Sequence, residues 1–155
     1  MEYAIENEYL IVTVTTWGAQ VKSVVRKFDD VEHMWQADKS VWGYHAPILF
    51  PHTGKVVDDL IETKGEVYQA KQHGFARLME HTLVRQTEDT IVMELRSCEE
   101  TLRIFPYAFR LVSTFTLDGD TLHHKLTVEN WDADKLYFGI GYHPAFTVPF
   151  DDEHT

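Results

Sequence analysis

Hydrophobic and polar positions alternate along much of this chain, and the alternation predicts a fold built from β-strands. The run 9–16 is rich in β-branched residues, and 19–28 resumes the pattern after Gly18 interrupts it. A pair of aspartates at 29–30 indicates a turn before the short run 33–35. Successive short strands joined by turns are typical of an antiparallel meander.

The strongest alternation lies in the second half of the chain, over 109–129. Apolar residues occupy alternate positions on both sides of Asp118-Gly119, a dipeptide that favours a tight hairpin turn. Strand-like runs precede this segment at 83–86 and 90–96, and an apolar run at 136–142 predicts one further strand.

Helical signals are confined to one short segment. Ser97-Cys98-Glu99-Glu100 fits a capping box in which Ser97 is the N-cap and Glu100 reaches back to it. A short helical turn should follow and end near Pro106. Many strands, one short helix and no internal repeat together predict an all-β sandwich.

Periodicity fades between 37 and 59, where aromatic residues, two prolines, glycines and histidines are mixed. Long irregular segments in compact domains are often functional. The alternative, that these aromatic side chains only pack over the end of a sheet, stays open at this point.

Length, charge and cysteine content narrow the class of protein. The 155 residues predict a single domain, and a hydrophobic content of 44% supports an ordered core. A formal net charge of -11 argues against nucleic acid or an acidic membrane as a partner. The single cysteine, Cys98, excludes an intramolecular disulfide, and no signal peptide or spanning apolar stretch is visible. A cytoplasmic location is therefore expected.

Two short segments carry side chains suited to proton transfer and to binding oxygen atoms. Gln72-His73-Gly74-Phe75-Ala76-Arg77 combines a histidine and an arginine around a glycine that permits positive φ. A surface turn with a satisfied histidine is the alternative interpretation. The second segment ends an apolar run at His143, which the following Pro144 should hold in extended backbone. His123 and His124 belong to no motif, and we interpret them as strand residues on opposite faces.

These two segments, with Pro47-Ile48-Leu49-Phe50-Pro51 upstream, resemble the aldose 1-epimerase (galactose mutarotase) family, and in particular its bacterial mutarotase-related branch. The resemblance runs from about Leu10 to Phe150. Further matching positions, in the expected order, are Gly18-Ala19, Trp42, Phe105-Pro106-Tyr107 and Asn130. It implies an antiparallel β-supersandwich, of which this chain supplies the N-terminal part, so that the domain at 1–155 is expected to be incomplete at its C-terminus.

The resemblance also implies a reaction and assigns roles to residues. A mutarotase opens the sugar ring with a base at the C1 hydroxyl and an acid at the ring oxygen, then closes it on the other face. The family's proton donor matches His143, and the histidine that binds the sugar near the ring oxygen matches His73. Arg77 matches a substrate or phosphate contact, and Gln72 is a neighbouring polar candidate.

Two positions depart from relatives that carry arginine. This chain has Tyr44 or His45 at the first and Lys55 at the second. We retain His45 and Lys55 as substrate-binding candidates, but lysine and histidine do not replace a bidentate guanidinium. A neutral sugar is therefore favoured over a sugar phosphate as the small-molecule partner.

The family's general base is a glutamate in a second half that this sequence does not contain, and Glu153 lies too near the end to be assumed to replace it. A non-catalytic carbohydrate-binding or sugar-sensing protein of the same fold is the alternative function. In either case Trp42, Tyr44 and Phe75 are candidates to stack on a sugar. A half sandwich also predicts open sheet edges and self-association, or an inert piece held by a partner.

A metal protein is a third class to consider, because the chain has nine histidines. The spacings do not support it, since no His-x-His, no His-Glu-x-x-His and no cysteine pair occurs. Neither a metal nor another cofactor is expected.

Overall fold

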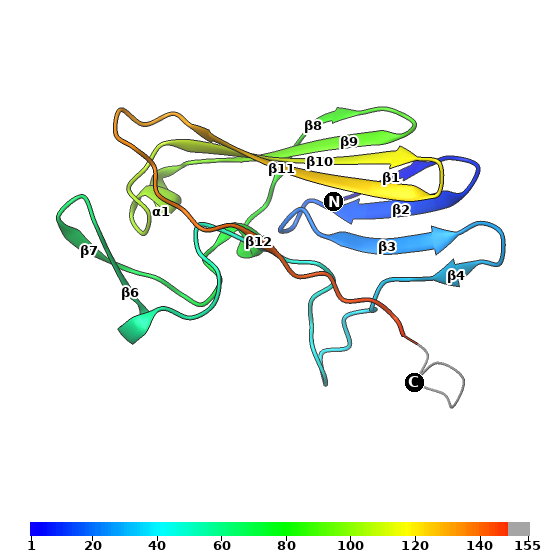
Figure 1. Ribbon diagram of the computed structural model, residues 1–155, viewed down its shortest axis with the longest axis horizontal. Helices are drawn as coiled ribbons and strands as arrows, with labels where there is room; N and C mark the ends of the chain where they lie inside the picture. Colours follow the sequence, from blue (N-terminus) through cyan, green and yellow to red (C-terminus); the bar gives the residue numbers. More distant parts are fainter. Residues whose placement is uncertain (149–155) are drawn as a thin grey trace.

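Two four-stranded antiparallel sheets form most of the molecule, in a computed structural model that describes residues 1–148 (Figure 1). The first sheet follows the chain order and confirms the predicted meander. Its strands are β1 (Glu2–Glu6), β2 (Leu10–Thr15), β3 (Val21–Arg26) and β4 (Val31–Glu32). Strands β2 and β3 begin and end within a few residues of the alternating runs, because alternation directs one set of side chains to the core. The sequence pattern did not predict β1, and β4 lies at 31–32 and not at 33–35.

The second sheet has the strand order β11-β10-β9-β8. Its strands are β8 (Thr82–Gln86), β9 (Thr90–Arg96), β10 (Phe109–Asp118) and β11 (Thr121–Asn130). Asp118 pairs with Thr121, so the predicted hairpin is confirmed, with Gly119 and Asp120 as its two loop residues. Gly119 adopts a φ of +57°, a backbone conformation that glycine allows without strain.

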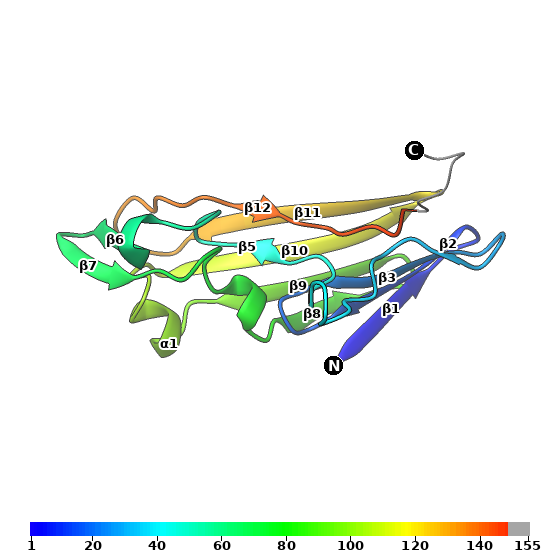
Figure 2. The same ribbon diagram turned by 90° about the horizontal axis from the view of Figure 1, so that it is seen from below.

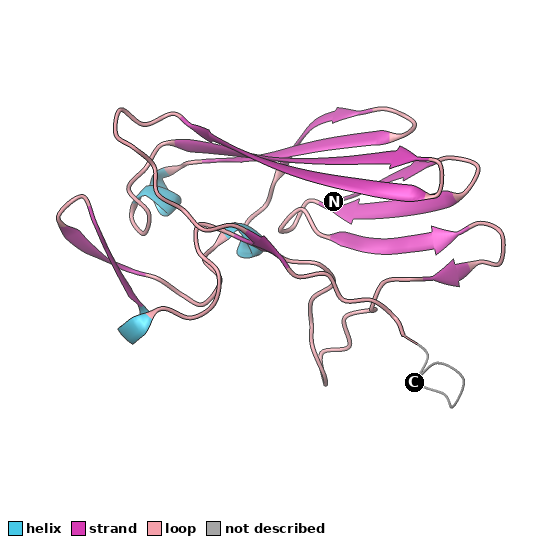
Figure 3. Ribbon diagram, viewed as in Figure 1, coloured by secondary structure: helices cyan, strands magenta, loops and turns pink. Residues whose placement is uncertain are grey.

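The remaining elements are short (Figure 3). Strands β5 (Ile48–Leu49) and β12 (Gly141–Tyr142) pair with each other, and β6 (Leu60–Thr63) pairs with β7 (Glu66–Gln69). The helical turns are η1 (Val57–Asp59), η2 (Ala76–Leu78) and α1 (Glu99–Leu102). No helix in this part of the chain is long and apolar enough to cross a membrane. The strand expected over 136–142 is correct only at its last two residues.

The predicted capping box is wrong by one position. Cys98 is the N-cap of α1, and the hydroxyl of Thr101 accepts a hydrogen bond from the Cys98 amide at 2.8 Å. Ser97 is held by β10 instead: its amide donates to the Phe109 carbonyl, and its hydroxyl accepts from the Phe109 amide. The hydrogen bonds between Ser97 and β10 thus replace the helix cap that the local sequence, a serine followed by glutamate three residues later, had indicated.

A single apolar core joins the two sheets. In the view of Figure 2 the β10–β11 hairpin lies above the strands β1–β3. Four phenylalanines form the part of the core nearest the irregular segments, with neighbouring ring centroids 5.1–6.4 Å apart: Phe50, Phe75, Phe105 and Phe109. Phe75 is only 8% exposed, so the expectation that it stacks on a sugar is wrong. The Phe75 ring packs in the core and so holds the loop that carries His73 against it.

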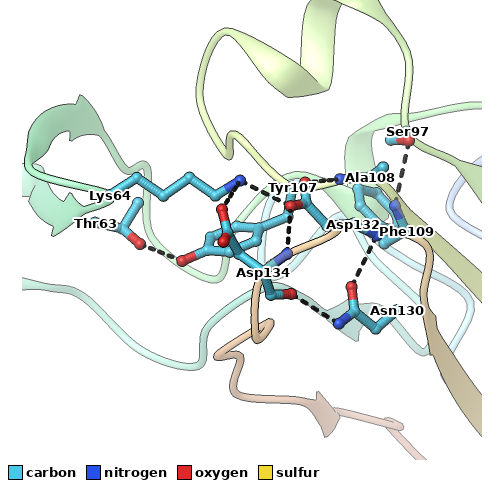
Figure 4. A network of polar contacts seen from close by, with 9 residues as sticks. All are labelled: Thr63, Lys64, Ser97, Tyr107, Ala108, Phe109, Asn130, Asp132 and Asp134. Atoms are coloured by element: carbon cyan, nitrogen blue, oxygen red, sulfur yellow. Dashed lines mark hydrogen bonds and ion pairs between the residues drawn. The ribbon is translucent and has the colours of Figure 1, made fainter.

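A polar network ties the β6–β7 hairpin to the end of the second sheet (Figure 4). The Asp132 carboxylate accepts hydrogen bonds from the amides of Ala108 and Asp134, and Lys64 of the hairpin turn donates to it at 2.9 Å. The two backbone amides and the Lys64 ammonium together lower the pKa of Asp132 to about 2. The hairpin therefore has a fixed attachment although it projects from the main body (Figure 1).

Candidate functional site

The backbone at His73 is held in an uncommon conformation. His73 and Gly74 both have left-handed φ angles, +66° and +69°. The His73 amide donates to the Gly54 carbonyl and the Phe75 amide donates to the Phe50 carbonyl, both at 2.9 Å. A Cβ at Gly74 would lie 2.1 Å from the Phe50 oxygen, so glycine is required by close approach to backbone. Non-glycine residues with positive φ persist where the surroundings over-determine them, often at functional sites.

The imidazole of His73 is oriented by the same loop. The Gly54 amide donates to Nδ1 at 2.9 Å, so the neutral ring carries its proton on Nε2. Desolvation lowers the pKa of His73, and the nearby Arg77, His143 and His52 lower it further. At neutral pH the ring is therefore uncharged and presents an Nε2–H donor. The side-chain amide nitrogen of Gln72 lies 3.3 Å from Nε2, and a flip of this amide places its oxygen there to accept from that donor.

His143 reaches the same region from the other end of the chain. Tyr142 pairs with Ile48, and the His143 amide donates to the Pro47 carbonyl at 3.1 Å. The residues that follow continue beside the irregular segment, because the Trp35 amide donates to the Ala145 carbonyl at 3.0 Å. The His143 side chain is exposed, and its ring makes no hydrogen bond with any residue in 1–148. It is thus available to exchange a proton with a bound molecule.

Arg77 lies on η2, four residues beyond His73. Its guanidinium lies over the Tyr44 ring, 5.0 Å from the centroid, and one terminal nitrogen donates to the Gln72 carbonyl at 3.0 Å. The Nε atom is buried and has no hydrogen-bond partner in the described part of the chain. The Arg77 backbone is packed against Gly18, where a Cβ would lie 2.7 Å from the Arg77 oxygen.

Six residues are linked by these contacts into an open series from His143 to His73 that we call the site ring; Arg77 joins it through the backbone carbonyl of Gln72. In contact order they are His143, Trp42, Tyr44, Arg77, Gln72 and His73. Centroid separations are 5.0 Å between Trp42 and His143 and 5.7 Å between Trp42 and Tyr44. The structure therefore brings together four of the six candidates from the sequence, with two aromatic residues of the irregular segment between them.

The other two candidates are placed outside the site ring. Nδ1 of His45 lies 2.8 Å from the Trp35 carbonyl, to which it donates. The Lys55 side chain is exposed, and its ammonium lies 4.0 Å from an Asp59 carboxylate oxygen. Sequence reasoning did not identify Gly54, whose amide orients His73 as described above. Nothing in the sequence marks that role, because it depends on a contact across 19 residues.

Two cavities are lined in part by neighbours of the site ring residues: Tyr142 and Pro144 line one, and Gly74 and Phe75 line the other. The larger, about 830 Å³, is lined mainly by apolar side chains of β2, β3 and β11, with Met34 and Phe146. The second, about 330 Å³, lies behind the loop that carries His73. The larger cavity also has charged side chains in its lining, among them Arg26, Lys27 and Asp120. No group of three or more histidine, cysteine or carboxylate side chains within residues 1–148 is arranged to hold a metal ion.

Comparison with known proteins identifies the family. The family model described as aldose 1-epimerase matches residues 1–155. The chain belongs to the aldose 1-epimerase family. Among curated proteins, this family member is 35% identical over 156 residues to the plasmid-encoded Protein LacX of Lactococcus lactis subsp. lactis. The match covers 96% of this chain and 52% of LacX, so the chain spans about half the length of the curated relatives it matches.

Solved structures agree on the fold of this aldose 1-epimerase family member. A galactose mutarotase related enzyme from Lactobacillus acidophilus superposes with a TM-score of 0.96 at 35% identity, covering 100% of this chain and 52% of its own. A galactose mutarotase-like protein from Lactobacillus casei superposes with a TM-score of 0.94 at 33% identity, and the match covers 99% of this chain and 52% of that protein. The predicted antiparallel, galactose mutarotase-like fold, present here as an N-terminal portion of such proteins, is confirmed.

Proposed function

We propose that this chain supplies the sugar-binding histidine and the general acid of a mutarotase that interconverts the α and β anomers of a hexose or a related sugar. The observation that supports it is the site ring, in which His143 and His73 come from distant parts of the sequence and lie within electrostatic reach of each other. Family membership supports the reaction class.

The surroundings of the two histidines suit different roles. His143 is exposed and its ring has no partner within residues 1–148, so in this proposal it carries the proton to the ring oxygen as the C1–O bond breaks. His73 keeps its Nδ1 occupied by the Gly54 amide and donates from Nε2 to a sugar oxygen. A ring whose second nitrogen is already bonded is well suited to orienting the substrate and poorly suited to taking up a second proton.

Arg77 and Gln72 complete the binding side of this proposal. The guanidinium lies over Tyr44 with its Nε buried, and its terminal N–H groups suit sugar hydroxyls. His45 and Lys55, outside the site ring, are left as candidates for contact with a longer or phosphorylated sugar. Because these two side chains are not gathered beside Arg77, the arrangement favours a neutral sugar over a sugar phosphate.

The general base is the part of the reaction that this chain does not supply in our proposal. None of the contacts that link the site ring involves a carboxylate within residues 1–148. In this proposal the base is the glutamate that the resemblance implies, expected in the half of the protein that the relatives have in addition. The same observation supports the second candidate function, a sugar-binding or sugar-sensing protein that does not catalyse the reaction.

Polarimetry on the natural gene product, with its intact mass measured in parallel, separates the two functions. We expect anomer interconversion of glucose or galactose above the buffer rate, and a loss of about 10²–10⁴-fold in His143→Ala. His123→Ala is the matched control, because His123 is exposed on β11 and should leave the rate unchanged. Sugar-dependent protection from unfolding with no rate above buffer would instead establish the binding protein.

A further inference from the structure

The orientation of His143 depends on few contacts, and one aromatic side chain provides the main one. The backbone of His143 is fixed by the Pro47 carbonyl, but the imidazole is exposed and has no hydrogen bond within residues 1–148. A histidine with a free χ1 samples three staggered positions. The indole of Trp42 lies against this imidazole, with centroids 5.0 Å apart and planes inclined by 41°.

Trp42 itself is held from several sides. Its amide donates to the Asp38 carbonyl at 2.7 Å, and its carbonyl accepts from the Trp35 indole at 2.8 Å. The ring is half-buried and packs on Tyr44, whose own ring lies under the Arg77 guanidinium. The backbone of Trp42 is thus held on both sides and its indole packs on a second aromatic ring, whereas within residues 1–148 the imidazole of His143 has Trp42 as its one aromatic neighbour and makes no hydrogen bond.

We propose that Trp42 is a positioning residue, whose indole holds the imidazole of His143 in the orientation from which it meets the sugar ring oxygen. This inference rests on the proposed function for its kinetic consequence, but the contact itself can be tested separately. An indole face also attracts a cation, so the contact persists when the imidazole is protonated. Misplacing a catalytic group by about 1 Å costs up to about 10²-fold in rate, which sets the scale of the effect.

Proton NMR tests the contact without any assay of activity. The ring current of Trp42 should shift a carbon-bound imidazole proton of His143 upfield, and His143→Gln assigns that resonance. In Trp42→Leu the resonance should move to the position of a solvent-exposed histidine, and in Trp42→Phe it should stay partly shifted. Trp131→Leu is the matched control, because Trp131 is exposed at the end of β11, where it lies against Arg96. An unchanged His143 resonance in Trp42→Leu would overturn the inference.

Kinetics of the natural gene product test the consequence. We expect Trp42→Leu to lower kcat about 10- to 100-fold while KM changes less than about threefold, and Trp42→Phe to restore most of kcat. A raised KM with kcat intact would refute the positioning role and make Trp42 a surface for stacking on the sugar. If the wild type shows no rate above buffer, the proposed function fails, and the NMR comparison alone decides whether Trp42 holds His143.

Discussion

At the scale of single residues, the fold uses its histidines in different ways. His73 and His143 belong to the site ring, whereas His81 is buried and His124 is half-buried in the body of the protein. His124 stacks on Phe115, with centroids 4.2 Å apart, and meets the edge of Tyr142 at 4.6 Å. The prediction that His123 and His124 point to opposite faces agrees with their burial, since His123 is exposed.

Protonation of His124 should destabilise the protein in acid. Burial lowers its pKa to about 4, so the unfolded chain takes up a proton below about pH 6.5 while the folded chain does not. This contribution to stability is complete above about pH 6.5 and is lost as the pH falls towards 4. Between about pH 6.5 and 4 the wild type should lose about 3 kcal/mol of unfolding free energy through His124. The variant His124→Leu should not show this part of the loss.

Urea unfolding of wild type and variant at several pH values measures this difference. His81 and His73 also have lowered pKa values, so both proteins keep some acid sensitivity and only the difference reports on His124. His123→Leu is the control and should follow the wild type. Parallel pH profiles for wild type and His124→Leu would contradict the prediction.

At the scale of elements, the loop that carries His73 depends on one glycine. Gly74 has a φ of +69°, and a Cβ there would meet both the oxygen and the carbon of the Phe50 carbonyl group. We expect Gly74→Ala to cost at least about 3 kcal/mol, because backbone strain adds to a clash that no side-chain movement relieves. Gly119→Ala is the matched control: its φ is +57° but nothing lies within 4 Å, so about 1 kcal/mol is expected.

Chemical denaturation gives both values, and NMR of the His73 imidazole shows whether the loop has moved. Equal losses of unfolding free energy in Gly74→Ala and Gly119→Ala would mean that the close approach to Phe50 does not contribute to the cost of the Gly74 substitution.

The Asp132 network gives a second prediction at this scale. With a pKa of about 2, the carboxylate stabilises the folded chain above its unfolded pKa of about 3.9, and this contribution is lost as the pH falls towards 2. We expect Asp132→Asn to remove that part of the acid dependence and to loosen the β6–β7 hairpin, measured by amide hydrogen exchange in 60–69. Asp120→Asn, on the β10–β11 turn, is the control, and slow exchange retained in Asp132→Asn would contradict the prediction.

At the scale of the whole molecule, the described surface has an unusual concentration of exposed apolar side chains on one segment. Between 131 and 148 they are Trp131, Tyr137, Phe138, Ile140, Phe146 and Val148. Beside them β11 is an edge strand of its sheet. An open edge next to apolar side chains favours association with another chain.

We therefore expect the 155-residue chain to self-associate as its concentration rises. Sedimentation velocity should show a mass above that of the monomer, and Tyr137→Ser combined with Phe146→Ser should return it to monomer. Val57→Ser is the control, because Val57 is 83% exposed on η1, outside this segment. A wild-type chain that stays monomeric at all concentrations would refute the prediction.

The sequence by itself determined most strands of the two large sheets, the β10–β11 hairpin and the family, but not β1 or β5. Alternation with period two reports directly which side chains face the core, and this information is local, so the limits of β2, β3, β9 and β10 could be read from it. The sequence pattern gave a wrong prediction where a contact with a distant segment determines the local structure. At Ser97, the polar groups pair with β10 instead of capping α1.

Only the tertiary structure decided how the candidate residues meet. The Gly54 amide that sets the tautomer of His73, the burial of Phe75 and the displacement of His45 towards Trp35 all depend on contacts between segments distant in sequence. The same holds for Trp42 and His143, which lie 101 residues apart and touch because β12 pairs with β5. Side-chain identity specifies what a residue can do chemically, whereas packing specifies which partner it meets.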